Sequence, residues 1–179
     1  MSTSKIYWIG LISCVFQAIF TIPYLMMMIY IWATGSKLDS LWGEISNILS
    51  LAQYIPLMIL VRERFYKNDL MISLLIFVLT IVFSMMLTGI SLIDDSAEDI
   101  FSVFEIISLF IGSVAFLIFS IKAMSIKTDI QPYWKIFCIT NIVTCTVLFT
   151  IILLPLAIFI NIFGSIMGAF VFSRALKDA

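Results

Sequence analysis

Long apolar stretches, separated by short segments that carry charge, make up nearly the whole chain. Uncharged runs cover residues 6–36, 45–61, 70–93 and 136–173, and the run over 100–121 contains a single acidic residue. The hydrocarbon core of a bilayer is about 30 Å thick, and about 20 helical residues cross it. Because a helix satisfies its own backbone hydrogen bonds in lipid, each of the four runs before residue 122 predicts one transmembrane helix.

The last run, residues 136–173, is about twice as long as one helix needs to cross a bilayer. Pro155 lies near its midpoint. Proline lacks a backbone donor and disfavours helical geometry at the preceding residue, so it predicts a turn between two spans. One kinked helix or a re-entrant segment is the alternative. The predicted spans are 6–33, 43–61, 70–93, 100–121, 136–154 and 156–173.

The distribution of Lys and Arg predicts the orientation of these spans. With six spans and a cytoplasmic N-terminus, nine of the ten Lys and Arg residues lie in cytoplasmic segments, and Lys37 alone lies outside. Cytoplasmic segments of membrane proteins are enriched in these residues. Five spans would move Arg174 and Lys177 to the outer side. All four tryptophans also fall at predicted membrane boundaries, where indole rings concentrate.

The composition agrees with a membrane protein. Hydrophobic residues make up 63% of the chain and charged residues 12%, against about 45–50% and 25% in soluble domains. No composition shift or linker divides the chain, so residues 1–179 are expected to form a single integral membrane domain. We therefore predict an all-α membrane protein, a polytopic bundle of six transmembrane helices with both the N- and C-termini cytoplasmic. Its compactness and charge asymmetry favour a plasma membrane, of the bacterial inner-membrane type.

The chain is poor in catalytic side chains. It contains no histidine, and its three cysteines lie inside apolar stretches with no C-x-x-C pair. No glycine-rich phosphate loop and no Gly-x-Ser-x-Gly motif occurs. We therefore expect no enzymatic activity, no catalytic residue, no cofactor and no bound metal, and a membrane enzyme is a minor alternative. The net charge of −1 gives no reason to expect a nucleic-acid partner.

Three polar residues inside the predicted spans are candidates for function. Glu105 lies about one turn inside the fourth span, and ionisable groups at membrane depth are often functional. The alternative is a headgroup-level carboxylate that the helix dipole stabilises. Gln53, three residues before Pro56, and Asn141 carry amides that either join neighbouring helices or line a polar cavity.

Small residues at a spacing of four predict where helices approach closely. Gly164 and Gly168 form a G-x-x-x-G motif in the last span, and Ser108 and Gly112 form a weaker version in the fourth. Two small residues four positions apart share one helix face and let another backbone approach. The contact can lie within the chain or between chains.

Two classes of function follow. The first is a non-enzymatic accessory or interaction protein that contacts another membrane protein through its helices, as assembly factors, subunits and immunity or exclusion proteins do. Its partners would be the lipid bilayer and a membrane protein, or further copies of the chain in a homo-oligomer. The second is a small transporter or channel with a polar path near Gln53, Asn141 and Glu105.

Overall fold

The described part of the protein is almost entirely helical. The structure is a computed structural model that describes residues 3–34, 40–65, 67–91, 98–148 and 154–177. These residues form six α-helices and no strand. The helices are α1 (Thr3–Thr34), α2 (Ser40–Phe65), α3 (Asn68–Ser91), α4 (Glu98–Met124), α5 (Tyr133–Leu148) and α6 (Leu154–Lys177).

Five of the six helices are long and apolar enough to cross a membrane, which makes this a membrane-embedded protein. The exception is α5, whose 16 residues extend about 24 Å. The remainder of its predicted span includes residues 149–153, which lie outside the described residues. Residues 35–39, between α1 and α2, and residues 92–97, between α3 and α4, also lie outside them.

Most helices are longer than the predicted spans because a helix does not end where its charge-free stretch ends. The span predicted over 43–61 is part of α2, whose last turn carries Arg62 and Arg64. Cations at a helix C-terminus are stabilised by the helix dipole, and at the membrane surface they remain solvated. The basic ends of α4 and α6, with Lys122 and Lys177, follow the same principle.

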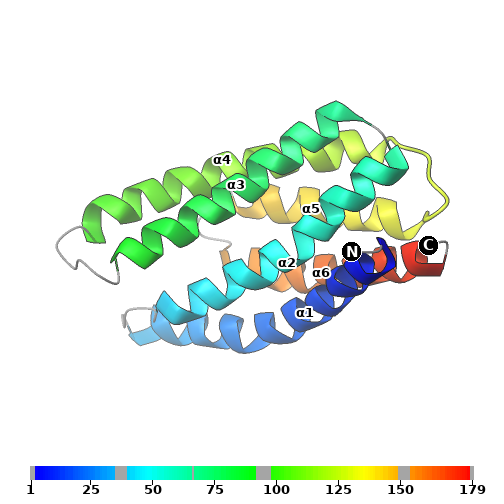
Figure 1. Ribbon diagram of the computed structural model, residues 1–179. Helices are drawn as coiled ribbons and strands as arrows, with labels where there is room; N and C mark the ends of the chain where they lie inside the picture. The colour runs from blue at the N-terminus through cyan, green and yellow to red at the C-terminus, as the bar shows by residue number, and fades with distance from the viewer. Residues whose placement is uncertain (1–2, 35–39, 66, 92–97, 149–153, 178–179) are drawn as a thin grey trace.

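The apolar run over residues 136–173 forms two helices that pack against each other, as predicted. Figure 1 shows α5 and α6 side by side and antiparallel. Pro155 is the second residue of α6. At the start of a helix the missing N–H of proline would have had no partner in any case, so Pro155 begins the helix without a kink. One continuous helix over this run is therefore excluded.

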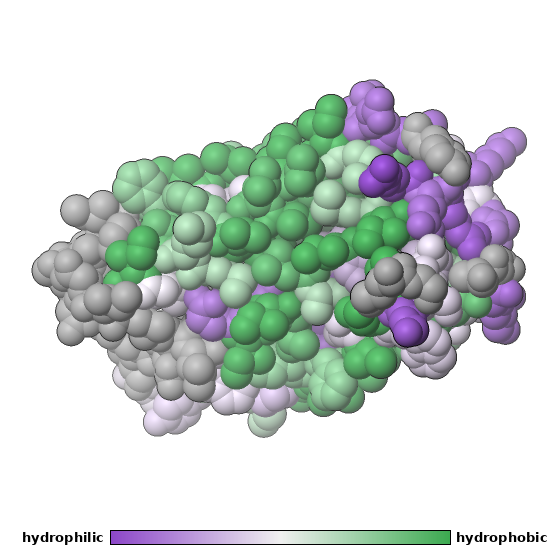
Figure 2. Space-filling model, viewed as in Figure 1, coloured by the Kyte–Doolittle hydropathy of each residue, from purple (hydrophilic) through white to green (hydrophobic). Residues whose placement is uncertain are grey.

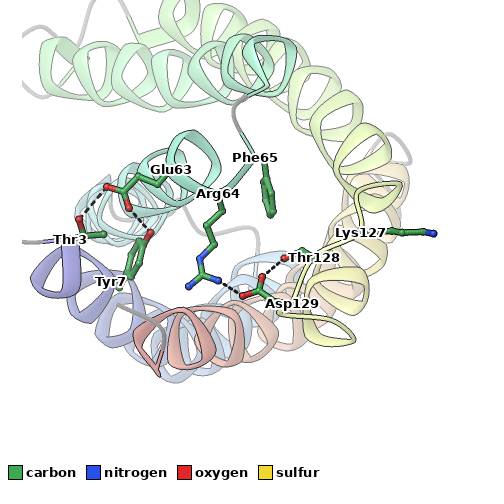
Figure 3. A pocket seen from close by; sticks show the side chains of 8 residues that line it. All are labelled: Thr3, Tyr7, Glu63, Arg64, Phe65, Lys127, Thr128 and Asp129. Carbon is green, nitrogen blue, oxygen red and sulfur yellow. Dashed lines mark hydrogen bonds and ion pairs between the residues drawn. The ribbon is translucent and has the colours of Figure 1, made fainter.

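The six helices form a closed ring. The principal packing contacts join each helix to the next along the chain, and α1 to α6. In Figure 3, which looks into the end of the bundle, the helices surround a common centre. The two ends of the described chain lie at the same end of the bundle (Figure 1). The ring thus has an interior onto which one face of every helix can be turned.

The outer surface of the ring is apolar, unlike that of a soluble protein, and the interior holds polar side chains beside a hydrophobic core. Large apolar side chains, such as Phe16, Met86 and Ile106, lie exposed on the flank of the bundle. Figure 2 shows this apolar belt, and it shows hydrophilic residues gathered at the end that holds the two termini. Among the described residues, ten Ser, Thr, Asn and Gln side chains are buried. In lipid, polar groups are driven toward the interior because the tails offer no hydrogen bonds.

Glycines allow the helices of the ring to approach closely. A Cβ atom at Gly10 of α1 would lie 2.6 Å from the ring of Phe172 in α6. A Cβ atom at Gly168 of α6 would lie 2.9 Å from Sγ of Cys14 and 3.5 Å from both Gln53 and Phe137. Four helices therefore converge at Gly168, and only glycine leaves room for them.

We predict that Gly168→Leu lowers the free energy of unfolding by about 1–3 kcal/mol, because the added side chain overpacks a buried four-helix contact. Gly43→Leu is the matched control, since nothing lies within 4 Å of a Cβ atom there. Thermal unfolding in mild detergent, followed by size-exclusion chromatography, measures both. Equal stability of the two variants would contradict the close packing at Gly168.

Candidate functional site

A cavity of about 240 Å³ lies inside the ring and is walled by five helices, α2 to α6. The described residues that line it include no Asp, Glu, Lys or Arg. Its polar wall consists of hydroxyl and amide side chains, namely Asn47, Ser50, Tyr54, Thr80, Ser84, Ser108, Ser113, Asn141, Thr144 and Asn161. Such a cavity can hydrogen-bond a small molecule without offering it a charge.

Helical periodicity turns these side chains toward the same space. On α2 the lining residues Asn47, Ser50 and Tyr54 follow one another at intervals of three and four, so they share one face. On α5 the same spacing brings Asn141 and Thr144 onto one face. The cavity thus receives polar side chains from each of the helices α2 to α6.

Aromatic rings close one side of the cavity. Tyr54, Phe77 and Phe116 all line it, and their rings contact one another. The ring of Tyr54 meets Phe77 edge-on at a centroid distance of 4.8 Å and Phe116 at 5.0 Å, and Phe77 stacks on Phe116 at 4.4 Å. Aromatic pairs in these geometries favour a rigid, close-packed arrangement. The cavity therefore has an apolar wall beside its polar one.

Asn141 is the cavity residue whose hydrogen bonding is least satisfied. Its side chain is only 2% exposed, and its amide nitrogen has no hydrogen-bond partner among the described residues. Its Oδ1 lies 3.3 Å from where Gly164 would carry a Cβ atom, so the glycine makes room for the amide. A buried amide donor without a partner costs about 1–3 kcal/mol. A ligand or water in the cavity would offset that cost.

Ser108 and Gly112, expected at a helix contact, lie where α4 meets α3 and also line the cavity. The Ser108 hydroxyl donates a hydrogen bond of 3.1 Å to the backbone carbonyl of Thr80. A Cβ atom at Gly112 would collide with the Thr80 side chain. The two small residues therefore let α3 approach α4 closely enough to form one wall of the cavity.

The structure does not bring the three candidate polar residues to one place. Asn141 lines the cavity, whereas Gln53 lies beside Gly168 and does not line it. Glu105 is half-buried between α3 and α4, where its carboxylate accepts a hydrogen bond of 2.9 Å from Thr88. Of the three residues, Asn141 alone lines the cavity, whose wall combines hydroxyl and amide side chains with aromatic and aliphatic ones.

Sequence reasoning missed most of this wall because single Ser and Thr residues are common in membrane helices. The signal that would have revealed them is their spacing. Thr80 and Ser84 are four residues apart, as are Ser50 and Tyr54. Searching each span for Ser, Thr and Asn residues that recur three or four positions apart would have identified several of the lining residues.

The described residues offer no metal centre, since no three of their His, Cys, Asp and Glu side chains lie close enough to hold an ion. Comparison of the chain with family models, curated proteins and solved structures gives no match. The geometry and chemistry of the cavity are therefore the basis for proposing a function.

We predict that Asn141→Leu raises the free energy of unfolding by about 1 kcal/mol, and the midpoint by about 2–4 °C, because it removes a buried donor without a partner. Ser165→Ala is a matched variant outside the cavity wall. Ser165 is 1% exposed, and its hydroxyl also lacks a partner in the described structure. Thermal unfolding in detergent measures both, and a marked loss of stability in Asn141→Leu would show that the amide is satisfied.

Proposed function

We propose that this protein is a small non-enzymatic transporter or channel that takes up a small uncharged polar solute from the membrane surface. The observation that supports this proposal is the cavity inside the ring, with its hydroxyl and amide wall and no charged lining residue among those described. A protein that acts only through its outer surface has no need of such a space. Of the two expected classes, the cavity favours the transporter or channel.

The glycine motifs support the same choice. An accessory protein needs small-residue faces that are free to meet a partner helix. Here Gly164 lies against Asn141, Gly168 against Cys14 and Gln53, and Gly112 against Thr80. These faces are used to pack the ring itself.

The chemistry of the walls indicates the class of solute. A charged solute would lose its hydration without gaining a counter-charge, and this is costly inside a membrane protein. A neutral solute with several hydrogen-bonding groups meets donors and acceptors such as Asn141 and Ser113, and its carbon atoms meet the aromatic wall. About 240 Å³ corresponds to the volume of about eight water molecules, enough for a small polyol or amide.

We further propose that all six helices span a plasma membrane of the bacterial inner-membrane type, with both termini cytoplasmic. The basic side chains support this orientation, because the described ones belong to the end of the bundle that holds the termini. Lys5 lies in the first turn of α1, Lys67 precedes α3, and Arg174 lies in the last turn of α6. Anionic lipid and the positive-inside tendency both favour that end on the cytoplasmic side.

Solute flux tests the proposal. In proteoliposomes we expect glycerol or urea to enter several-fold faster than in protein-free liposomes, measured by stopped-flow light scattering after an osmotic step. Asn141→Leu should bring the rate close to that of protein-free liposomes, because it removes the buried amide whose donor is free to bind the solute. Ser165→Ala, which removes a buried hydroxyl that does not line the cavity, should keep the normal rate.

Tetraethylammonium and acetate serve as charged comparison solutes, and we expect no protein-dependent entry of either. Entry of these ions at the rate of glycerol would contradict selection by a neutral wall. Failure of both glycerol and urea to enter faster than in protein-free liposomes would overturn the proposed function.

An accessory role is the second candidate, and one observation favours it. A groove of about 560 Å³ lies between α1 and α6 and is lined almost entirely by apolar side chains, among them Val15, Ala18, Ile19 and Ile166. Its chemistry suits a transmembrane helix of another membrane protein. Because the groove and the cavity do not share lining residues, the two roles can be tested separately.

We predict that Ala18→Trp, which fills this groove, abolishes co-purification of a stoichiometric membrane-protein partner while leaving glycerol flux unchanged. Ile106→Trp is the control, since Ile106 is 64% exposed on α4 and does not line the groove. Quantitative mass spectrometry after mild-detergent purification compares the two. Recovery of the same partner by Ala18→Trp, or no stoichiometric partner for the unchanged chain, would exclude the groove as a docking site.

A further inference from the structure

A continuous column of aromatic rings fills the interior of the bundle between the cavity and the end that holds the termini. Tyr54, in the cavity wall, contacts Phe116, and Phe116 stacks on Phe119 at 5.6 Å. The ring of Phe119 meets Trp134 at 6.4 Å, and Trp134 meets Phe65 at 4.9 Å. We call these five residues the aromatic plug. Phe119 and Trp134 are fully buried, so the column is dry and closely packed.

Beyond the aromatic plug lies a second hollow, which we call the vestibule. It has a volume of about 580 Å³ and is lined by Phe65 together with polar and charged residues from α1, the end of α2 and the α4–α5 connection (Figure 3). Tyr54 lines the cavity and Phe65 lines the vestibule, so the two ends of the plug each face a hollow. The plug is thus the barrier between a neutral cavity and a charged opening.

Two neighbouring side chains at the end of α2 connect the elements around the vestibule. The Glu63 carboxylate accepts hydrogen bonds from the hydroxyls of Tyr7, at 2.8 Å, and Thr3, at 3.1 Å, both in α1. Arg64 forms an ion pair with Asp129 of the α4–α5 connection and donates to the Ala175 carbonyl of α6 at 3.2 Å. Figure 3 shows these side chains reaching across the opening. Phe65, the last ring of the plug, directly follows Arg64.

The Arg64–Asp129 pair is charged at neutral pH. Partial burial raises the pKa of the Asp129 carboxyl, but the hydrogen bonds from Thr128 and Arg64 and the charge of Arg64 outweigh it, so the pKa lies below its ordinary value. A carboxyl group whose pKa is lowered in the folded state stabilises the structure at pH values above its ordinary pKa. This stabilisation is lost as the pH falls through the lowered pKa. The pair is therefore complete under physiological conditions.

We propose that the end of α2 is a gate: the Arg64–Asp129 and Tyr7–Glu63 bonds hold the aromatic plug closed, and their release connects the cavity with the vestibule. This inference rests on the proposed function, because a gate requires a solute that leaves the cavity on this side. The unbroken aromatic contacts give the closed state, with the cavity separated from the end that holds the termini.

The bonds that hold the gate closed are weak enough to break while the bundle stays folded. The side chain of Asp129 is 59% exposed and that of Arg64 is 18% exposed. An exposed ion pair changes the equilibrium between the closed and the open gate only weakly, by at most about fivefold. Its loss therefore lowers the population of the closed state without unfolding the bundle. Rings that pack through dispersion alone can separate and rejoin, whereas a buried ion pair within the plug would resist both steps.

Accessibility of a cavity thiol tests the gate. The reporter is Ser113→Cys, in the cavity wall of α4, in a chain whose cysteines at 14, 138 and 145 are replaced by alanine. A neutral, sugar-linked methanethiosulfonate, whose hydroxyl groups keep it from crossing the bilayer, is applied to right-side-out and inside-out vesicles, and the labelling rate from the vestibule face is measured. Size-exclusion chromatography establishes that each variant is folded.

We expect slow labelling from the vestibule face in the reporter chain and labelling about three- to fivefold faster after Asp129→Asn. Asp129→Glu, which keeps the charge, should keep the slow rate. Tyr7→Phe removes one hydroxyl and one bond to Glu63, so it should raise the rate independently. Asp69→Asn is the matched control, because Asp69 is an exposed aspartate in the first turn of α3 that does not line the vestibule.

A second reporter, Lys127→Cys, separates gating from access to the vestibule. Lys127 lines the vestibule but points away from its centre (Figure 3), so its labelling rate should be the same with and without Asp129→Asn. An unchanged rate at Ser113→Cys in both Asp129→Asn and Tyr7→Phe would overturn the gate, even where glycerol flux is normal. Faster labelling in both variants, with no flux of glycerol or urea, would support the gate and overturn the proposed function.

Discussion

The packing of α1 against α6 is the contact on which the rest of the structure depends. Every other principal contact joins helices that follow one another along the chain. The α1–α6 contact closes the ring, and it is formed where Gly10 admits the ring of Phe172, which also lies against Tyr7 at 6.3 Å. Without it the polar faces of the helices would meet lipid, where unsatisfied polar groups cost several kcal/mol each. The interior, the cavity and the vestibule exist because the ring is closed.

Within the closed ring, the polar side chains differ in where they find hydrogen-bond partners. Several of the Ser and Thr hydroxyls donate to a carbonyl one turn earlier in their own helix, as Thr21 does to Gln17 and Ser73 to Asp69. These groups need no partner from another helix and so say little about function. Asn141 differs because its amide has more hydrogen-bonding capacity than its own helix can use. An amide with an unused donor in a cavity wall is therefore more informative than the many hydroxyls around it.

The sequence predicts the helices well and the site only in part. The reason is that hydropathy locates a membrane helix along the chain but does not orient its faces. Mean hydropathy and charge spacing reveal that a segment enters lipid, so all six helices could be predicted. They do not reveal which face of a helix turns inward, because a span is apolar nearly all round. Glu105 is therefore a candidate on sequence alone, and the structure adds that it lies between α3 and α4, bonded to Thr88. The G-x-x-x-G motif predicted a close approach but not the identity of the helices that meet at Gly168.

The two ends of the interior differ in a way that follows from where charge is tolerated. Within the membrane an ion pair loses more hydration than it regains, so the cavity and the plug use hydroxyls, amides and aromatic rings. At the end of the bundle water is near, and forming or breaking an ion pair such as Arg64–Asp129 changes the free energy only slightly. A gate built from such pairs controls the packing of rings that themselves carry no charge. Selection by the neutral wall and control by the charged end can thus be carried by different residues of one small ring, with α2 extending from one to the other.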